Sequence, residues 1–345
     1  MEKGQMHILK ATPETVKWGF FDNNLEPALK VKSGDIVYLE ALAHHAGDAP
    51  DLMMDEGVRA VYESIPEEER GPGVHLLTGP VYVEGAKPGD VLEVKVLDMK
   101  PRLAYGCNFE ANWGLLFEEF GKQERVNIYE VDLVSNSARA VFSYPFPGFC
   151  DIPGRITEPS SVTRELFLKD VSVPLCLHFG TAGVAQKEAG KINSIPPGAF
   201  GGNMDNKSFV AGTNMLYPVQ VEGALFVAGD SHFAQGDGEI SGTAIEGHVN
   251  AIVQFNLRDD IKIKDNPVLE TPTHWVCHGF NEDLDIAIKQ AAIEAIEFLK
   301  ANMGLTQAEA YSLLSVAGDF HITQVVDGVK GVHCKIAKHM FAPGR

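Results

Sequence analysis

The sequence contains few cysteines, and none lies in a pattern typical of a metal site or a disulfide framework. Five cysteines occur in 345 residues, widely scattered and odd in number: Cys107, Cys150, Cys176, Cys277 and Cys334. No CxxC spacing occurs, which argues against a zinc site built from thiolates. We therefore expect reduced thiols and a cytoplasmic location.

Positive charge and long apolar runs are also scarce. Lys and Arg number 29 against 47 Asp and Glu, which gives a formal net charge of −18. Nucleic acids and anionic membranes bind proteins through clustered Lys and Arg side chains, so the acidic net charge argues against both as partners. No segment approaches the roughly 20 apolar residues of a membrane span, and the first residues lack the apolar core of a signal peptide. We expect a homo-oligomer that acts on a small neutral molecule.

The residues that are abundant favour β structure. The 34 glycines and 19 prolines indicate many turns, and alternating or β-rich segments at 28–32, 36–43 and 91–97 are typical of strands. At this length the chain could form one large domain or several smaller ones. We divide it into β-rich portions at 1–150 and 151–260 and an α+β portion at 261–345.

The helical signal is confined to the last portion. Residues 284–300 carry an apolar stripe at helical spacing, and Gly304 predicts the end of that helix. A second helix is predicted over 306–316, where Thr306 and Glu309 have the spacing of a capping box. The fold class is therefore β-rich α+β.

The segment 223–239 is the strongest candidate for a functional site. Residues 224–228 resemble a strand covered on both faces, and glycines and polar side chains follow. If the strand continues, Asp230 and His232 point to one face and could bind one metal ion. Glu239 could then act as a base. The alternatives are ordinary turn chemistry and a Glu239 that caps a helix beginning near Ser241.

Two other segments carry polar residues beside glycines. The loop 195–206 contains Asn203 and Asp205 two positions apart, and we expect it to face the 223–239 segment. His178 precedes a glycine-rich turn, where a buried structural histidine is the alternative to a role in the site.

These motifs resemble those of the acetamidase/formamidase family over nearly the whole chain. The resemblance rests on Gly201-Gly-Asn-Met-Asp205 and on the 223–239 segment, with weaker support from the segments at 88–91, 157–161 and 178–184. The segment His44-His45-Ala-Gly-Asp48 resembles a longer-chain, formamidase-like branch. The resemblance implies hydrolysis of short aliphatic amides. It also implies a jelly-roll-like β-sandwich, a small β-barrel portion and a C-terminal α+β portion.

The residue types suit metal-assisted hydrolysis. The mixture of imidazole and carboxylate ligands makes zinc the first choice of divalent ion. The expected ligands are Asp230, His232, Asp205, His44 and His45. Glu239 is the expected base, and either Asn203 or a glycine amide is expected to stabilise the oxyanion. The expected substrate-binding residues are Gln235, His178 and Gly202.

Two other functions are compatible with the sequence. A thiol mechanism would use Cys107 or Cys150, although no base can be connected to either cysteine and no Gly-x-Ser-x-Gly motif supports a serine hydrolase. The other function is that of a β-sandwich protein that binds a metal or small ligand without turnover. Release of ammonia from acetamide or formamide separates an enzyme from a binding protein.

Overall fold

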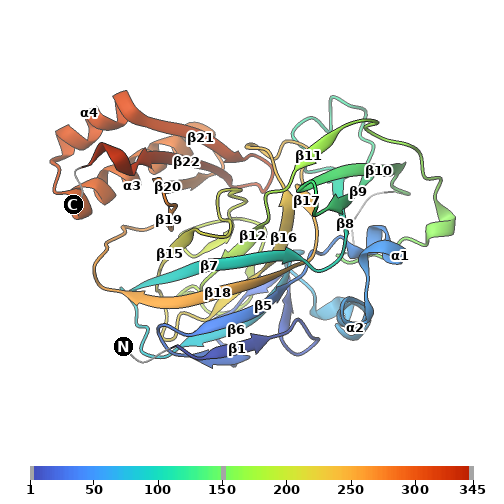
Figure 1. Ribbon diagram of the computed structural model, residues 1–345, viewed down its shortest axis with the longest axis horizontal. Coiled ribbons are helices and arrows are strands. Elements are labelled where there is room, and N and C mark those ends of the chain that lie inside the picture. Colours follow the sequence, from blue (N-terminus) through green and yellow to red (C-terminus); the bar gives the residue numbers. More distant parts are fainter. Residues whose placement is uncertain (1–3, 149–152, 342–345) are drawn as a thin grey trace.

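The computed structural model describes residues 4–148 and 153–341, which form two large β-sheets and one small one (Figure 1). The first large sheet contains, in spatial order, β1 (Met6–Leu9), β5 (Ile36–Ala41), β18 (Val249–Arg258), β7 (Val91–Pro101), β15 (Asn214–Pro218), β19 (Val268–Glu270), β20 (His274–Asn281), β22 (Lys330–Ala337) and β21 (Gly318–Gln324). Its pairs are antiparallel except β1 with β5. This sheet therefore runs from the first strand of the chain to the last two.

The second large sheet has β16 near its centre. Its strands, in spatial order, are β11 (Ser172–Pro174), β10 (Ser137–Pro145), β9 (Arg125–Asp132), β8 (Tyr105–Glu110), β17 (Ile245–Glu246), β16 (Phe226–Ala234), β12 (His178–Gly183) and β14 (Gly201–Asn203). Beside this path, β6 (Leu76–Val83) pairs with β16, β2 (Val16–Trp18) and β4 (Leu29–Val31). The small sheet joins β3 (Phe20–Phe21) to β13 (Ile192–Asn193).

The two large sheets share one hydrophobic core. Apolar side chains of β5, β7 and β18 meet those of β6, β12 and β16 in a single buried cluster. The expected β-barrel portion is not found in residues 4–148 and 153–341. Each sheet ends on strands that do not pair with each other, β1 and β21 in one and β11 and β14 in the other. The β-rich class is confirmed, and the barrel is corrected to open sheets.

Strand β16 confirms the expectation of a strand covered on both faces. All nine of its residues are buried, and it pairs with β12, β6 and β17. It begins at Phe226, two residues later than expected, because Ala224 and Leu225 adopt positive φ angles of 59° and 54°. It continues through Asp230 and His232, which confirms the condition for bringing these two side chains together.

Two short helices follow β5, α1 (Pro50–Met53) and α2 (Glu56–Ser64), and two longer ones follow β20, α3 (Leu284–Met303) and α4 (Gln307–Ala317). Gly304 ends α3 in a left-handed conformation, and the predicted capping box of Thr306 and Glu309 begins α4. Both predicted helices are confirmed. No helix in the described part of the chain is long and apolar enough to cross a membrane.

The C-terminal helices cover one face of the extended first sheet (Figure 1). Phe298 and Leu299 of α3 pack in a buried cluster with Cys277 and Cys334, which lie opposite each other on β20 and β22. The other face of these strands turns toward the rest of the chain. Because β15 pairs with β19, the first sheet continues across the expected boundary at residue 260. The division into portions 1–150, 151–260 and 261–345 stays a prediction.

Candidate active site

A cavity of about 130 Å³ lies where β16 meets loops from both ends of the chain. Three imidazoles and five carboxyl groups line it: His44, His75, His232, Asp205, Asp230, Glu239, Glu246 and Asp327. Asn203, Trp113, Ile195 and Val326 are among the other lining residues. The structure therefore brings together six of the ten predicted site residues, Asp230, His232, Asp205, His44, Glu239 and Asn203.

Asp230 and His232 lie together on one face of β16. His232 Nε2 is 3.5 Å from Asp230 Oδ2 and 3.2 Å from Glu246 Oε2. Burial opposes a charge on His232, yet the carboxylates of Glu246 and Asp230 raise its pKa well above the usual value. Burial likewise opposes ionisation of Asp230, but the surrounding imidazoles, His75 foremost, hold its pKa well below the usual range.

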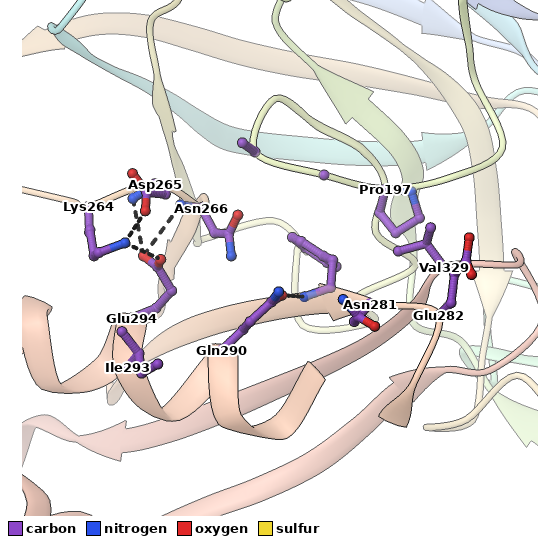
Figure 2. A pocket seen from close by; sticks show the side chains of 13 residues that line it. Pro197, Lys264, Asp265, Asn266, Asn281, Glu282, Gln290, Ile293, Glu294 and Val329 are labelled. Atoms are coloured by element: carbon purple, nitrogen blue, oxygen red, sulfur yellow. Dashed lines mark hydrogen bonds and ion pairs between the residues drawn. The ribbon is translucent and has the colours of Figure 1, made fainter. Parts of the chain in front are cut away.

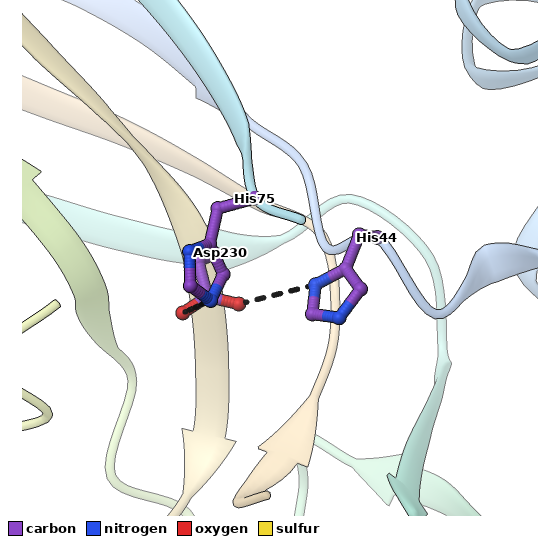
Figure 3. Close-up of side chains that lie close together, drawn as sticks. All are labelled: His44, His75 and Asp230. Carbon is purple, nitrogen blue, oxygen red and sulfur yellow. Dashed lines mark ion pairs between the residues drawn. The ribbon is translucent and has the colours of Figure 1, made fainter. Parts of the chain in front are cut away.

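Two histidines from the N-terminal part of the chain face Asp230 from the other side (Figure 3). His44 Nδ1 lies 3.6 Å from Asp230 Oδ1, and His75 Nε2 lies 3.5 Å from Asp230 Oδ2. Potential ligand atoms of the three residues all lie within 4.8 Å of one another. Burial, with the neighbouring His45, lowers the pKa of His44 to about 3, so His44 is neutral and keeps a lone pair available for a cation.

The remaining carboxyl groups are held at high pKa by burial. Burial raises the pKa of Asp205 to about 6. Burial, reinforced by the charge of Asp205, raises the pKa of Glu239 well above its usual value, and burial also raises the pKa of Glu246. Burial without a compensating positive charge shifts each of these carboxyl groups toward the protonated form.

Three of the cavity acids have strained backbones. Asp205, Asp230 and Glu239 adopt positive φ angles of 50°, 48° and 48°. This conformation is unfavourable for residues with a β-carbon, and such strain concentrates at functional sites. Residues 235–244, which include Glu239, form a loop without a helix. The alternative in which Glu239 caps a helix near Ser241 is therefore wrong.

Asn203 lines the cavity, and its side-chain oxygen is hydrogen-bonded. Thr181 Oγ1 donates a hydrogen bond of 2.6 Å to Asn203 Oδ1 and lies 3.1 Å from Asp230 Oδ2. Because Oδ1 is already engaged, the NH₂ group is the part of the side chain left for a ligand. A carbonyl oxygen in the cavity could accept that hydrogen bond.

Gln235 and His178 lie behind His232 rather than along the cavity. Gln235 Nε2 donates to the backbone oxygen of Asp205 at 2.6 Å, so Gln235 Oε1 faces His232 Nδ1 at 3.1 Å. His178 Nε2 is 3.2 Å from the same nitrogen. Burial, with the nearby His232, lowers the pKa of His178 to about 4, which makes it an acceptor. When His232 is neutral, the two residues favour its Nδ1–H tautomer, which leaves the Nε2 lone pair for the cavity.

The other two predicted site residues also lie outside the cavity lining. Gly202 has a φ angle of 76°, and a β-carbon there would meet the ring of Phe200 at 2.6 Å. His45 turns away from Asp230, and its Nδ1 bonds to Asp48 Oδ2 at 2.8 Å. The ring of His45 contacts the ring of His44 of the site, with centroids 4.1 Å and planes 44° apart.

The cavity lining has unsatisfied polar atoms, and their chemistry fits a cation. Burying a polar atom without a hydrogen bond costs about 1 to 3 kcal/mol, yet five such atoms gather here: His44 Nδ1, Asp205 Oδ1, Glu239 Oε2, Glu246 Oε2 and Asp327 Oδ2. Of these, Glu246 Oε2 keeps its ion pair with His232 Nε2 at 3.2 Å. All five can donate a lone pair to a metal ion. The donor set of imidazole and carboxylate therefore fits a divalent cation of the zinc type.

Three ionisable cavity residues were not predicted from the sequence: His75, Glu246 and Asp327. His75 directly precedes β6, and Leu77 pairs with Gly229 of β16, which places His75 beside Asp230. The position of His75 before an apolar strand is a signal that could have been used. Asp327 precedes Gly328 in the turn between β21 and β22, and nothing local separates it from an ordinary turn residue.

A larger hollow of about 680 Å³ lies elsewhere, between the loop at Pro197 and helix α3 (Figure 2). Three of its charged side chains already pair with each other, since Lys264 contacts Asp265 and Glu294. Gln290 Oε1 accepts a hydrogen bond from the backbone of Phe280. No histidine lines this hollow, so it lacks the acid–base groups of the cavity around Asp230.

Known proteins resemble this chain over most of its length. The sequence profile of the Acetamidase/Formamidase family matches residues 17–341. A formamidase of Methylophilus methylotrophus is 30% identical over 305 residues, 74% of each chain. An acetamidase of Mycolicibacterium smegmatis is 28% identical over 303 residues, 70% of this chain and 73% of the relative.

A solved structure agrees with the sequence matches. An acetamidase from Bacillus halodurans superimposes with a TM-score of 0.75 at 28% identity and covers 97% of this chain and 98% of its own. The two motifs that carried the resemblance, at 201–205 and 223–239, contribute Asn203, Asp205, Asp230, His232 and Glu239 to the lining of the cavity. The chain belongs to the acetamidase/formamidase family.

Proposed function

We propose that this protein hydrolyses short aliphatic amides such as formamide and acetamide, to the carboxylate and ammonia, with a water molecule activated by a divalent cation. Membership of the family makes the chain an amide-hydrolysing enzyme. The part played by the cation is our inference. The five buried lone-pair atoms without a hydrogen bond around one cavity are the observation that carries it.

His44, His75 and Asp230 are the residues that would hold the cation, since their ligand atoms converge and three protein ligands are typical of a catalytic zinc site. His232 faces the same carboxylate and could bind the same ion or a neighbouring one with Glu246. A divalent cation bound there supplies Lewis acidity to a water molecule and to the amide carbonyl. We propose zinc, because the ligands mix imidazole and carboxylate.

Glu239 is our proposed proton carrier. Its raised pKa suits a carboxylate that takes a proton from water and returns it to the leaving nitrogen near neutral pH. The amide of Asn203 would donate to the carbonyl oxygen as negative charge develops on it. Gln235 and His178 would act through His232, by fixing its ring.

The size of the cavity favours small substrates. Its 130 Å³ correspond to about four water molecules at the volume each takes in the liquid. Trp113, Ile195 and Val326 contribute apolar walls, and Trp113 Nε1 donates to the oxygen of Gly242 at 2.8 Å, which fixes the indole. An amide with a short acyl group fits this space.

The thiol mechanism receives no support at Cys107. Its sulfur is buried and bonds to Asp48 Oδ2 at 3.4 Å, outside the cavity lining. Burial, with the charge of Asp48, raises the pKa of Cys107 well above its usual value, whereas a nucleophilic cysteine needs a lowered pKa. Cys150, the other candidate, lies outside the described residues.

The location, the oligomeric state and the domain organisation of the protein are also proposals. We propose a cytoplasmic homo-oligomer with a jelly-roll-like sandwich and the three portions 1–150, 151–260 and 261–345. Exposed apolar side chains around the end of β10 support self-association: Leu133, Val134, Leu166, Leu168 and Val171.

Two measurements on the purified protein test the proposed function. Ammonia release from formamide and acetamide should be catalysed, should stop after removal of metal by a chelator, and should return with added Zn²⁺. Activity that persists in protein shown to be free of metal would contradict the role of the cation but not amide hydrolysis. Bound metal without ammonia release would favour the non-catalytic alternative.

A further inference from the structure

Three histidines form a row across the C-terminal strands. His278 of β20 and His321 of β21 both lie directly opposite His333 of β22, and residues opposite each other share a face of the sheet. The rings of His321 and His333 stack with centroids 5.2 Å apart and planes 8° apart. Because Cys277 and Cys334 pack against α3, the row occupies the other face, toward the loops of the catalytic portion.

The loop that carries Glu239 docks beside this row. Gly238 N–H donates to the oxygen of Thr323 at 3.0 Å, and Val325 N–H donates to the oxygen of Gly238 at 3.2 Å. Asp237 therefore sits against β21, with its Oδ2 3.5 Å from His321 Nδ1. Potential ligand atoms of Asp237, His321 and His333 all lie within 4.8 Å of one another. None of the three lines the cavity around Asp230.

His333 has a buried ring nitrogen without a hydrogen-bond partner, which is independent support for a ligand at this cluster. The residue is 1% exposed, and its Nε2 has no hydrogen-bond partner. Its Nδ1 bonds to Thr323 Oγ1 at 2.7 Å. Donation from Nδ1–H to that hydroxyl leaves a lone pair on Nε2, the arrangement seen where a second group orients a metal-bound histidine. Burial lowers the pKa of His333 well below its usual value, which keeps the ring neutral.

We propose that Asp237, His321 and His333 form a second cation site, separate from the cavity, that binds a zinc-type divalent ion with solvent completing its shell. Two imidazoles and a carboxylate are a ligand set that such ions accept. The side chains of Asp237 and His321 are 29% and 37% exposed, which gives an ion access from solvent.

Lys207 competes with the ion for Asp237. Its Nζ lies 3.4 Å from Asp237 Oδ2, and its side chain is 33% exposed. The flexible ammonium stem can swing into solvent when a divalent ion takes the carboxylate. Cation binding and the Lys207–Asp237 ion pair are therefore mutually exclusive, which gives the site a distinctive response to mutation.

An ion at this site would tie three segments together. It would fix the loop 235–242, which carries Glu239, to β21 and β22, and the turn between these strands carries Asp327. Glu239 and Asp327 both line the cavity. The second site is thus a positioning device for two cavity carboxyl groups.

Zinc titration of metal-free full-length protein, followed by calorimetry, tests the proposal. Wild-type protein should bind one equivalent more than His321→Ala and one more than Asp237→Asn. The matched control is His274→Ala on β20, a histidine whose ring bonds to neighbouring Thr273 and belongs to neither proposed site, and it should keep the wild-type number. Equal stoichiometry in wild type and both variants, or loss of an equivalent in the control, overturns the proposal.

Two further variants separate this site from the cavity. Lys207→Ala should tighten the additional equivalent on the order of tenfold, because it removes the competing ammonium; unchanged or weaker binding contradicts the competition with Lys207. Asp230→Asn should weaken cavity binding but retain the equivalent that His321→Ala loses. If Asp230→Asn and the double variant with His321→Ala bind the same amount of zinc, no separate site exists.

Discussion

Gly180 lies against the imidazole of His232 so closely that a β-carbon at residue 180 would be 2.4 Å from Cε1 and 2.5 Å from Nε2 of that ring. Such contacts are far inside the van der Waals distance. The absence of a side chain at Gly180 therefore sets where His232 can stand. Replacement of Gly180 acts on the cavity without removing any of its polar groups.

Gly180→Ala should lower kcat/KM on the order of a hundredfold, the scale of a displacement of about 1 Å in a catalytic group. Gly236→Ala is the matched control, because a β-carbon there meets nothing within 4 Å. The measurement is ammonia release by both variants, with circular dichroism to establish folding. Wild-type activity in folded Gly180→Ala would show that the position of His232 is not critical.

Glu239→Gln should lower kcat by about 10² to 10⁴ while metal content stays at the wild-type level. The substitution keeps the size of the side chain at a strained backbone position and removes only its capacity to carry a proton. Kinetics and elemental analysis on the same preparation check this. A variant that loses metal along with activity would identify Glu239 as a ligand instead.

Asp230→Asn and His75→Ala should each lower zinc affinity and activity together, because both residues belong to the group shown in Figure 3. Asn tolerates the positive φ of residue 230 better than Ala does, so the aspartate variant should stay folded. Activity should fall by at least about a hundredfold, in line with the loss of an activating metal. Full zinc content in either variant would remove that residue from the proposed ligands.

Cys107→Ser should retain most of the amidase activity, because no thiol nucleophile is needed and the hydroxyl preserves a donor to Asp48. Cys107→Ala should also remain active but lose about 1 to 3 kcal/mol of stability, since it leaves Asp48 short of a partner. Urea unfolding and kinetics separate the two effects. A loss of amidase activity of about a thousandfold in both folded variants would support the thiol mechanism.

His248 should make stability depend on pH. Its Nδ1 accepts from Ala43 N–H at 3.1 Å and its Nε2 donates to the oxygen of Met53 at 2.9 Å, and burial lowers its pKa to about 4. The unfolded pKa is about 6.5, so the unfolded state binds the extra proton between these values. Stability from this group is fully present above about pH 6.5 and is lost as pH falls toward 4.

The free energies of unfolding of wild type and His248→Gln should therefore converge on acidification. The difference should shrink by as much as about 3 kcal/mol between pH 7 and pH 4. Urea unfolding at several pH values measures it. A constant difference would mean that His248 titrates alike in both states.

Local sequence patterns predicted what is local in this structure. The burial of β16, the ends of α3 and α4, and the approach of Asp230 to His232 all follow from spacing and turn chemistry within one segment. His75 reaches the cavity only because β6 pairs with β16. That pairing joins segments about 150 residues apart, and no periodicity in either segment encodes it.

Strand pairing between distant segments also explains why two predicted substrate-binding residues lie outside the cavity lining. Gln235 and His178 are polar residues beside the motif, so they were expected to touch substrate, yet the antiparallel pairing of His178 with His232 turns them toward the imidazole. Whether a polar side chain faces a ligand or supports another side chain depends on the strand register.

The first sheet, which runs from β1 to β21, also bears on when the enzyme becomes active during its synthesis. His44 leaves the ribosome early, whereas Asp327 emerges almost 300 residues later, in the turn between the two last strands of the sheet. The cavity lacks one of its walls until then. We therefore expect nascent chains to hydrolyse no amide, and expect C-terminally truncated products to leave the carboxyl-rich cavity open to water.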